Sequence, residues 1–174
     1  MSGSGTPAGQ RIHGKGRRVA IIATRWHAEI TDALVTGALD ACAASGVRMD
    51  EDVEVLHVPG AFELPVVASA AARSRRFDAV VCLAAVVRGD TPHFDYVCRA
   101  VTDGCNRVAL DTGIPVGFGV LTVDSIDQAR ERSGVGADDN KGREATLAAL
   151  ETACLLDVIH GGVHTRGLPA GPAL

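Results

Sequence analysis

Four short apolar segments alternate with helical segments along the chain, and this alternation limits the fold more than any other feature. Residues 17–24, 77–87 and 114–121 are mostly apolar, and residues 52–58 alternate apolar with polar side chains. Apolar residues recur at helical spacing in the remaining segments, which predicts helices over 29–45, 63–75, 92–110, 125–132 and 141–159. Repeated strand–helix units favour an α/β fold, a three-layer α/β/α sandwich with a four-stranded parallel sheet.

The composition fits one folded domain and excludes several classes of protein. The 174 residues are 47% hydrophobic, too apolar for a disordered chain. We expect a single domain over 17–160, with flexible tails at 1–16 and 161–174. The longest apolar run, 79–87, is shorter than the roughly 20 residues that cross a bilayer. Residues 1–10 show no apolar segment of a secretion signal. We therefore expect neither secretion nor a membrane partner.

Charge and cysteine content narrow the choice further. The chain has a net charge of −4 and is 3% aromatic, which is unlike a nucleic-acid-binding surface. Lys15, Arg17 and Arg18 are expected to form a solvated edge before the first strand. The five cysteines are odd in number and form no Cys-x-x-Cys pair, which favours reduced thiols and a cytoplasmic location. His160 and His164 are assigned no metal.

Candidate site residues follow the first two predicted strands. In a parallel sheet, ligands bind beyond the carboxyl ends of the strands. Trp26 comes directly after the first strand, where an indole either stacks on a planar ligand or fills a layer between helix and sheet. Pro59-Gly60 forces a tight turn after the second strand, directly before Phe62 and Glu63. Glu63 is either a ligand-binding carboxylate or one that caps the next helix.

The segment after the third strand is the richest in candidate residues. Thr91 is a predicted N-cap, with Pro92 at the first helical position. Backbone N–H groups at 89–91 and the helix dipole predict an anion-binding site. His93 would lie in the first turn, where an imidazole exchanges protons near neutral pH. The alternative is a hydrogen-bonded structural histidine.

Phe118 stands between Gly117 and Gly119 at the end of the predicted fourth strand, a pattern that indicates close approach of the backbone to a flat ligand. Arg132 and Lys141 are either phosphate-neutralising or ordinary surface charges. No GxGxxG, GxxxxGK[ST] or GxSxG motif occurs. The residues thus predict a pocket for a flat ring and an anion, without fixing the reaction.

Four segments in order resemble one family over about residues 17–157: VPGAFELP (58–65), AVVRGDTPHFDYVC (85–98), PVGFGVLT (115–122) and NKG (140–142). They resemble the 6,7-dimethyl-8-ribityllumazine synthase family of riboflavin biosynthesis. The resemblance implies a flavodoxin-like fold and a transferase without cofactor or metal. It implies that 5-amino-6-(D-ribitylamino)uracil condenses with 3,4-dihydroxy-2-butanone 4-phosphate, releasing phosphate and water.

The resemblance also implies a role for individual residues. Trp26 and Phe118 match the aromatic residues that hold the ring, and His93 matches the proton donor. Arg132 matches the cationic partner of the phosphate, and Lys141 lies in the NKG element. The other implied substrate-binding residues line the ring, the ribityl chain or the phosphate: Ala61, Phe62, Glu63, Ala85, Val86, Val87, Asp90 and Thr91.

Two residues depart from the family pattern. Ala84 stands where glycine is usual and is expected to narrow the ring slot. Asp90 adds a carboxylate beside the phosphate site, which we expect to point outward. The family forms homopentamers, some of them packed into 60-subunit shells, with active sites between neighbouring subunits. The spacing of Arg132 and Lys141 favours a free homopentamer.

Three other functions are compatible with a fold of this class. A non-catalytic flavin- or lumazine-binding protein would keep the ring slot but lose turnover, against which His93 and Arg132 argue. A flavodoxin-like redox or signalling module needs a phosphate loop after the first strand, and residues 24–28 offer none. A purely structural shell subunit would carry the pocket incidentally.

Overall fold

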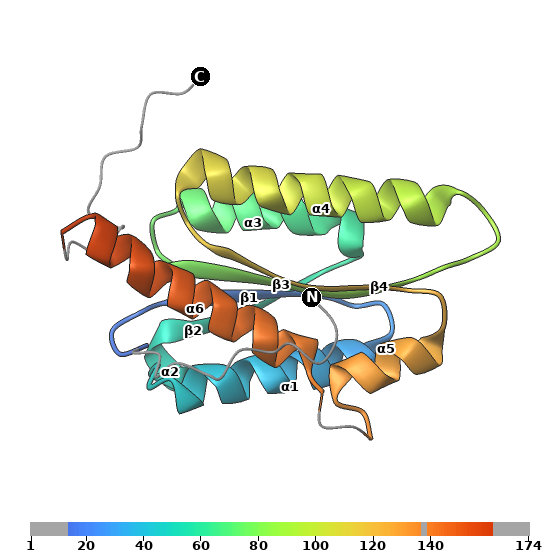
Figure 1. The fold of residues 1–174 in the computed structure, drawn as a ribbon, viewed down its shortest axis with the longest axis horizontal. Coiled ribbons are helices and arrows are strands. Elements are labelled where there is room, and N and C mark those ends of the chain that lie inside the picture. The colour runs from blue at the N-terminus through green and yellow to red at the C-terminus, as the bar shows by residue number, and fades with distance from the viewer. Residues whose placement is uncertain (1–13, 137–138, 162–174) are drawn as a thin grey trace.

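A computed structural model of the chain describes residues 14–136 and 139–161. It confirms the predicted fold class, with helices on both faces of a four-stranded parallel sheet (Figure 1). The strands are β1 (Val19–Thr24), β2 (Val53–Val58), β3 (Ala79–Val87) and β4 (Val116–Val123). The helices are α1 (Ala28–Ala44), α2 (Met49–Asp52), η1 (Ala61–Glu63), α3 (Leu64–Arg73), α4 (His93–Thr112), α5 (Ile126–Ser133) and α6 (Lys141–Ile159). The predicted tails lie outside the described residues, apart from 14–16 and Gly161.

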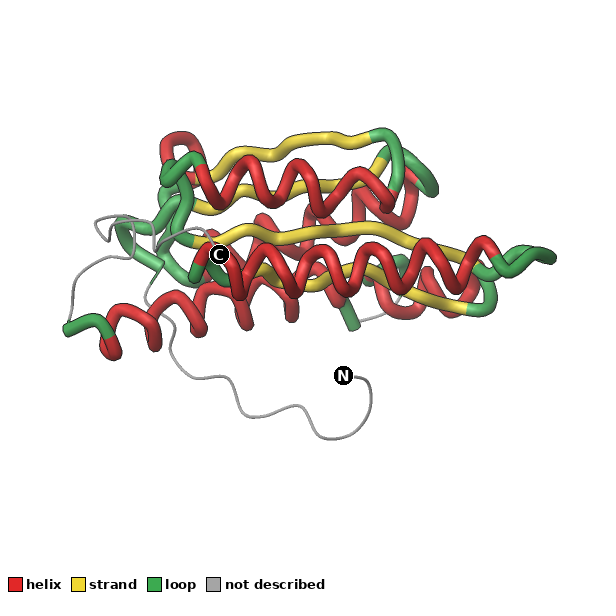
Figure 2. The backbone as a smooth tube through the Cα atoms, turned by 90° about the horizontal axis from the view of Figure 1, so that it is seen from above, coloured by secondary structure: helices red, strands yellow, loops and turns green. Residues whose placement is uncertain are grey.

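The strand order is β2-β1-β3-β4, which leaves β1 and β3 in the interior of the sheet. Figure 2 shows the four strands side by side. The interior position of β3 confirms the prediction from its apolar sequence, because both faces of such a strand are covered by helices. All pairings are parallel, so the carboxyl ends of the strands meet at one edge, at the right in Figure 1.

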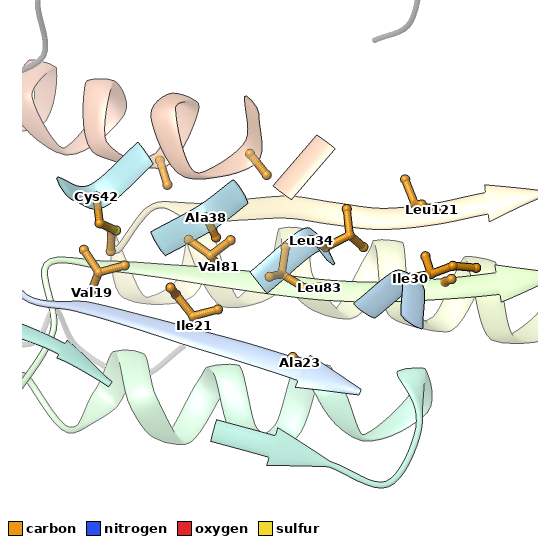
Figure 3. Packing of buried hydrophobic residues seen from close by; sticks show 14 of the residues in the cluster. Val19, Ile21, Ala23, Ile30, Leu34, Ala38, Cys42, Val81, Leu83 and Leu121 are labelled. Carbon is orange, nitrogen blue, oxygen red and sulfur yellow. The ribbon is translucent and has the colours of Figure 1, made fainter. Parts of the chain in front are cut away.

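Alternating side chains of the strands fill two separate cores. Ala20 and Ile22 of β1 pack beneath α3 and α4. Val19, Ile21 and Ala23 point to the opposite face, where they pack with α1 and α6 (Figure 3). This is the period-two pattern of a buried strand. The cores consist almost entirely of aliphatic residues, so the protein buries few of its aromatic side chains.

Some element boundaries differ from the sequence prediction. The assignment of Thr91 as N-cap was wrong, because α4 begins at His93 and the capping position is Pro92, at φ −60°. The Pro92 carbonyl already accepts the N–H of Asp95 at 3.0 Å. The predicted fourth strand, 114–121, ended two residues early, because Thr122 and Val123 still pair with β3.

Gly117 lets α6 approach the sheet, and this helix fills the space beside the glycine. A Cβ at Gly117 would overlap the backbone carbonyl of Ala145 in α6. A Cβ at Gly119 would overlap the side chain of Leu83 on the neighbouring strand. The predicted close approach is therefore real, but its partners are a helix and a strand of the same chain.

The expectation of a solvated edge before β1 was wrong for Arg17. The residue is only 4% exposed, and its guanidinium pairs with Asp157 near the end of α6 at 2.6 Å. Because the two residues are 140 positions apart, the partner cannot be found from local sequence. The pair fastens the start of β1 to the last turns of α6.

Candidate active site

A cavity of about 380 Å³ opens at the carboxyl end of the sheet, beneath the start of α4. Its walls come from the segments after β1 and β2, from the end of β3 and from the first turns of α4. This is the edge at which parallel sheets bind ligands. The lining residues are Thr24, Trp26, His27, Gly60, Ala61, Phe62, Glu63, Ala85, Val86, Val87, Gly89, Thr91, His93, Phe94 and Val97.

Most of the predicted site residues line this one cavity. Trp26 is 68% exposed and Phe62 is 63% exposed, so both rings are available to a ligand. The alternative in which Trp26 fills a core layer was wrong. The other predicted residues in the lining are Ala61, Glu63, Ala85, Val86, Val87, Thr91 and His93.

A buried hydroxyl holds the turn that carries Trp26. Thr31 is 1% exposed, and its Oγ1 donates toward the carbonyl oxygens of Trp26 at 2.7 Å and His27 at 2.9 Å. His27 adopts the left-handed conformation, with φ 54°, which is uncommon for a residue with a side chain. The surrounding contacts thus fix this turn in an unfavourable conformation beside the cavity.

The turn after β2 depends on Gly60 and Glu63. The Gly60 N–H donates to Oε2 of Glu63 at 2.9 Å. A Cβ on Gly60 would lie 3.1 Å from that oxygen and 3.8 Å from Cδ1 of Trp26, so glycine allows the two side chains to approach the turn. The Glu63 side chain does not cap α3, but by accepting the Gly60 N–H it caps the short helix η1, so the helix-capping alternative holds there. The same contact fixes the carboxylate at the edge of the cavity.

The start of α4 provides the conditions for binding an anion. Gly89, Thr91 and His93 line the cavity where this 20-residue helix begins. The first N–H groups of a helix have no partner within it, and the dipole places partial positive charge there. The side chain of the exposed His93 has no hydrogen-bond partner among the described residues, which leaves its imidazole available to a ligand.

Arg88 fastens this segment to the end of the sheet. Its N–H donates to the Val123 carbonyl at 2.9 Å, and its guanidinium pairs with Asp124 at 2.8 Å and Asp95 at 3.3 Å. The same group lies 4.2 Å from the centroid of the Phe94 ring. The hydrogen bond to Asp124 raises the pKa of Arg88 above its ordinary value. The position of the first turn of α4, which bears the catalytic candidate His93, therefore depends on Arg88.

Replacing Arg88 with methionine is expected to lower kcat about three- to tenfold by loosening the first turn of α4. The thermal midpoint should change little, because exposed ion pairs contribute little to stability. Arg76→Met is the matched control, because Arg76 also pairs with a carboxylate, that of Glu54, and lies over a ring, that of Phe77. Steady-state kinetics of both variants test this expectation, and equal kcat values in the two would contradict it.

Two of the predicted site residues, Asp90 and Phe118, do not line the cavity. Asp90 is exposed and is not among the lining residues, although its neighbours Gly89 and Thr91 are. Phe118 is 41% exposed on the edge strand β4, where it pairs with Cys82 of β3. The prediction that Phe118 stands at a strand end was wrong, because β4 continues beyond it to Val123.

Arg132 and Lys141 belong to elements on the other face of the sheet. Figure 1 shows α5 and α6 on the side opposite α3 and α4. Arg132 in α5 donates through Nη1 to the Gln128 carbonyl at 3.0 Å. Lys141 pairs with Glu144 at 2.8 Å and Asp139 at 3.0 Å. Burial lowers the pKa of Lys141, but these two carboxylates outweigh it and the net shift is upward.

The NKG element has a structural function that the sequence analysis missed. The Asn140 side chain donates to the carbonyls of Ala33 and Ser133 at 2.9 and 2.7 Å, and accepts the N–H of Arg143 at 3.0 Å. A Cβ on Gly142 would overlap the backbone of Leu34. Asn140 and Gly142 therefore join α6 closely to α1.

The cavity also contains residues that the sequence analysis did not assign to it. Val97 lies one helical turn after His93 and shares its face of α4, a spacing that was a usable signal. No pattern in the sequence marked Thr24 or His27 as a site residue. Ala84, expected to narrow the ring slot, is fully buried in the core beneath α3 and α4. That expectation was wrong, because packed helices cover this position.

Comparisons with known proteins agree with this arrangement. The sequence profile of the family described as 6,7-dimethyl-8-ribityllumazine synthase matches residues 16–157. A protein of that name from Frankia casuarinae is 57% identical over 157 residues, covering 90% of this chain and 96% of the relative. One from Kineococcus radiotolerans is 55% identical over 157 residues, covering 90% and 94%.

The chain belongs to the 6,7-dimethyl-8-ribityllumazine synthase family. This membership confirms the predicted family, the predicted transferase activity in riboflavin biosynthesis and the use of small-molecule substrates by a homo-oligomer. None of these matches favours a non-catalytic binding protein.

Neither a cluster of metal-binding side chains nor a membrane-spanning helix is found among the described residues. Over 14–136 and 139–161, no group of three or more His, Cys, Asp or Glu side chains is arranged to hold a metal ion. In the same part of the chain, no helix combines the length and apolar character needed to cross a membrane.

Proposed function

We propose that the cavity binds 5-amino-6-(D-ribitylamino)uracil and 3,4-dihydroxy-2-butanone 4-phosphate and condenses them to 6,7-dimethyl-8-ribityllumazine, phosphate and water. One observation carries the proposal: exposed Trp26, exposed His93 and the N-terminus of α4 line one cavity. The substrates need a surface for a flat ring, a group that transfers protons and a site for an anion. Each of these three features meets one of those needs.

The two substrates occupy different parts of the cavity in this proposal. Trp26 stacks on the pyrimidine ring, and Ala85, Val86 and Val87 line the ring slot. Ala61, Phe62 and Glu63 contact the ring and the ribityl chain. The backbone N–H groups of Asp90 and Thr91, in the segment just before α4, hold the phosphate. Asp90 contributes only its N–H, because its exposed side chain does not line the cavity.

The reaction then uses His93 for proton transfer. The amine of the uracil attacks the ketone carbonyl, a C–N bond forms and water leaves as the imine forms. Elimination of phosphate breaks a C–O bond and leaves an enol, which becomes a ketone. The ribitylamino nitrogen attacks this ketone, and the second C–N bond forms with loss of a second water, which closes the ring of the lumazine. His93 moves protons during imine formation and phosphate loss, and holding the two substrates together lowers the barrier further.

Each cavity is completed by a neighbouring copy of the chain. Phe118 and Arg132 lie away from the cavity of their own subunit, although the family resemblance implies that both contact substrate. We therefore assign Phe118 to a ring contact, and Arg132 to a phosphate contact, in the cavity of an adjacent subunit, with Lys141 nearby. The spacing between Arg132 and Lys141 favours a free homopentamer over a 60-subunit shell.

Replacing Arg132 with alanine is expected to raise KM for the butanone phosphate about 10- to 100-fold, because a charge-assisted contact to phosphate is lost. KM for the uracil substrate should stay within twofold. Arg107→Ala is the control, because Arg107 is an exposed arginine of α4 that pairs with Asp111 within its own helix. An Arg132→Ala protein with unchanged KM for the butanone phosphate would refute the phosphate assignment.

The function itself is tested by mixing the two substrates with the protein and following the absorbance of the lumazine. A rate well above the uncatalysed condensation is expected. No rate above that background would refute the proposal. We further propose a cytoplasmic location and a single domain over 17–160, in line with the reduced cysteines predicted from the sequence.

A further inference from the structure

One buried hydroxyl that lines the cavity has no hydrogen-bond partner among the described residues. Thr24 ends β1 and is 2% exposed, and it is one of the lining residues. Its Oγ1 makes no hydrogen bond within the part of the chain that the structure describes. Buried polar groups are rarely left unsatisfied in proteins, so an exception at a binding cavity calls for an explanation.

The other buried hydroxyls of the described chain show that Thr24 is exceptional. Thr31 donates toward the Trp26 carbonyl at 2.7 Å, Ser133 to the Arg130 carbonyl at 3.0 Å and Thr146 to the Gly142 carbonyl at 2.8 Å. Each of these three hydroxyls is satisfied within the fold. Thr24, which alone among the four lines the cavity, is not.

The strand register places Thr24 at the floor of the cavity. Ala23 pairs with Leu83 of β3, and Thr24 has the same strand parity as Ile22, whose side chain packs beneath α3 and α4. Its side chain therefore lies on the face of the sheet that carries the cavity. Trp26, two residues further on, is 68% exposed at the rim.

Because Thr24 is buried at the floor of the cavity and Trp26 is exposed at its rim, the two residues contact different parts of the uracil substrate. Its ring stacks on Trp26 and its reacting amine must stay near His93, and both of these residues are exposed. The ribityl chain takes no part in bond formation and is flexible, so it is the part that can reach the floor. Its hydroxyls both donate and accept, as Thr24 Oγ1 does, whereas the neighbouring Ala85, Val86 and Val87 side chains have no polar atom.

We propose that Thr24 Oγ1 hydrogen-bonds a hydroxyl of the ribityl chain and thereby selects substrates that carry this polyol. The inference rests on the proposed function. The hydroxyl has no partner among the described residues, and the ribityl hydroxyl supplies one when the substrate binds.

Thr24→Val tests the inference, because valine keeps the branched shape and removes the hydroxyl. KM for the ribitylaminouracil should rise about tenfold, while kcat and KM for the butanone phosphate stay within twofold. Thr24→Ser should restore most of the affinity. Thr146→Val is the matched control, because its hydroxyl is also buried but is satisfied inside α6. An unchanged KM for the ribitylaminouracil in Thr24→Val would overturn the inference.

A binding measurement distinguishes a contact between Thr24 and the ribityl chain from a contact between Thr24 and the ring. Thr24→Val should weaken binding of 6,7-dimethyl-8-ribityllumazine about tenfold and leave binding of 6,7,8-trimethyllumazine, which lacks the polyol, unchanged. Equal weakening of both would overturn the assignment to the chain. A wild-type protein that binds both lumazines but condenses nothing would refute the proposed function, while the comparison of the two ligands would still decide the role of Thr24.

Discussion

Replacing His93 with alanine is expected to lower kcat about 100-fold while KM for both substrates stays within about threefold. General acid–base catalysis is worth about 10²–10⁴-fold. We expect the lower end, because the amine and the ketone still react when they are held together. The Trp26 ring and the N-terminus of α4 remain in place to hold them. Turnover should therefore become slow without disappearing.

The measurement is the steady-state rate of lumazine formation with each substrate varied in turn. His160→Ala is the matched control, because it removes the same kind of side chain at the exposed end of α6. That end lies across the molecule from the start of α4 (Figure 1). The assignment of proton transfer to His93 fails if His93→Ala turns over at the wild-type rate.

Replacing Gly142 with alanine is expected to lower the free energy of unfolding by about 3 kcal/mol. The added Cβ would overlap the Leu34 carbonyl, and a backbone atom in a packed helix cannot rotate away as a side chain can. Helices α1 and α6 would have to separate, which disturbs the contacts of Asn140 with the Ala33 carbonyl and with the Ser133 carbonyl. The preference of helices for alanine over glycine offsets only about 1 kcal/mol of the loss.

Urea unfolding at one fixed protein concentration measures this loss, because the stability of an oligomer depends on concentration. Gly89→Ala is the control: a Cβ at Gly89 meets no atom within 4 Å, so its midpoint should match that of the wild type. Equal midpoints for Gly142→Ala and Gly89→Ala would show that close approach of α1 and α6 is not required.

The fold class was predictable because each strand and helix is marked by residues within its own segment and the strand–helix unit is repeated along the chain. A strand such as β3 is marked by its own apolar residues, and a helix such as α6 by its own periodicity. The predicted helix over 141–159 has the bounds of α6. Boundaries were less predictable, because the end of β4 is set by pairing with Val86 and Val87 of another strand.

The lining of the cavity was predictable where a residue lies in the segment that follows a strand. Trp26, Phe62 and His93 come from three such segments, and parallel strands bring their carboxyl ends to one edge. Phe118, Arg132 and Lys141 show the limit of this reasoning. Their positions relative to the cavity depend on β4, α5 and α6, and one chain does not bring them to it.

The strand–helix order, the edge of the sheet that carries the cavity and the family could all be predicted from the sequence, because each depends on the residues of short segments. The folded structure was needed to show what Gly117 approaches, which residue pairs with Arg17 and which buried hydroxyl, that of Thr24, has no partner among the described residues. These outcomes depend on contacts between elements distant in sequence. Close packing makes such contacts sensitive to a change of a single methylene group, and no local pattern of residues predicts them.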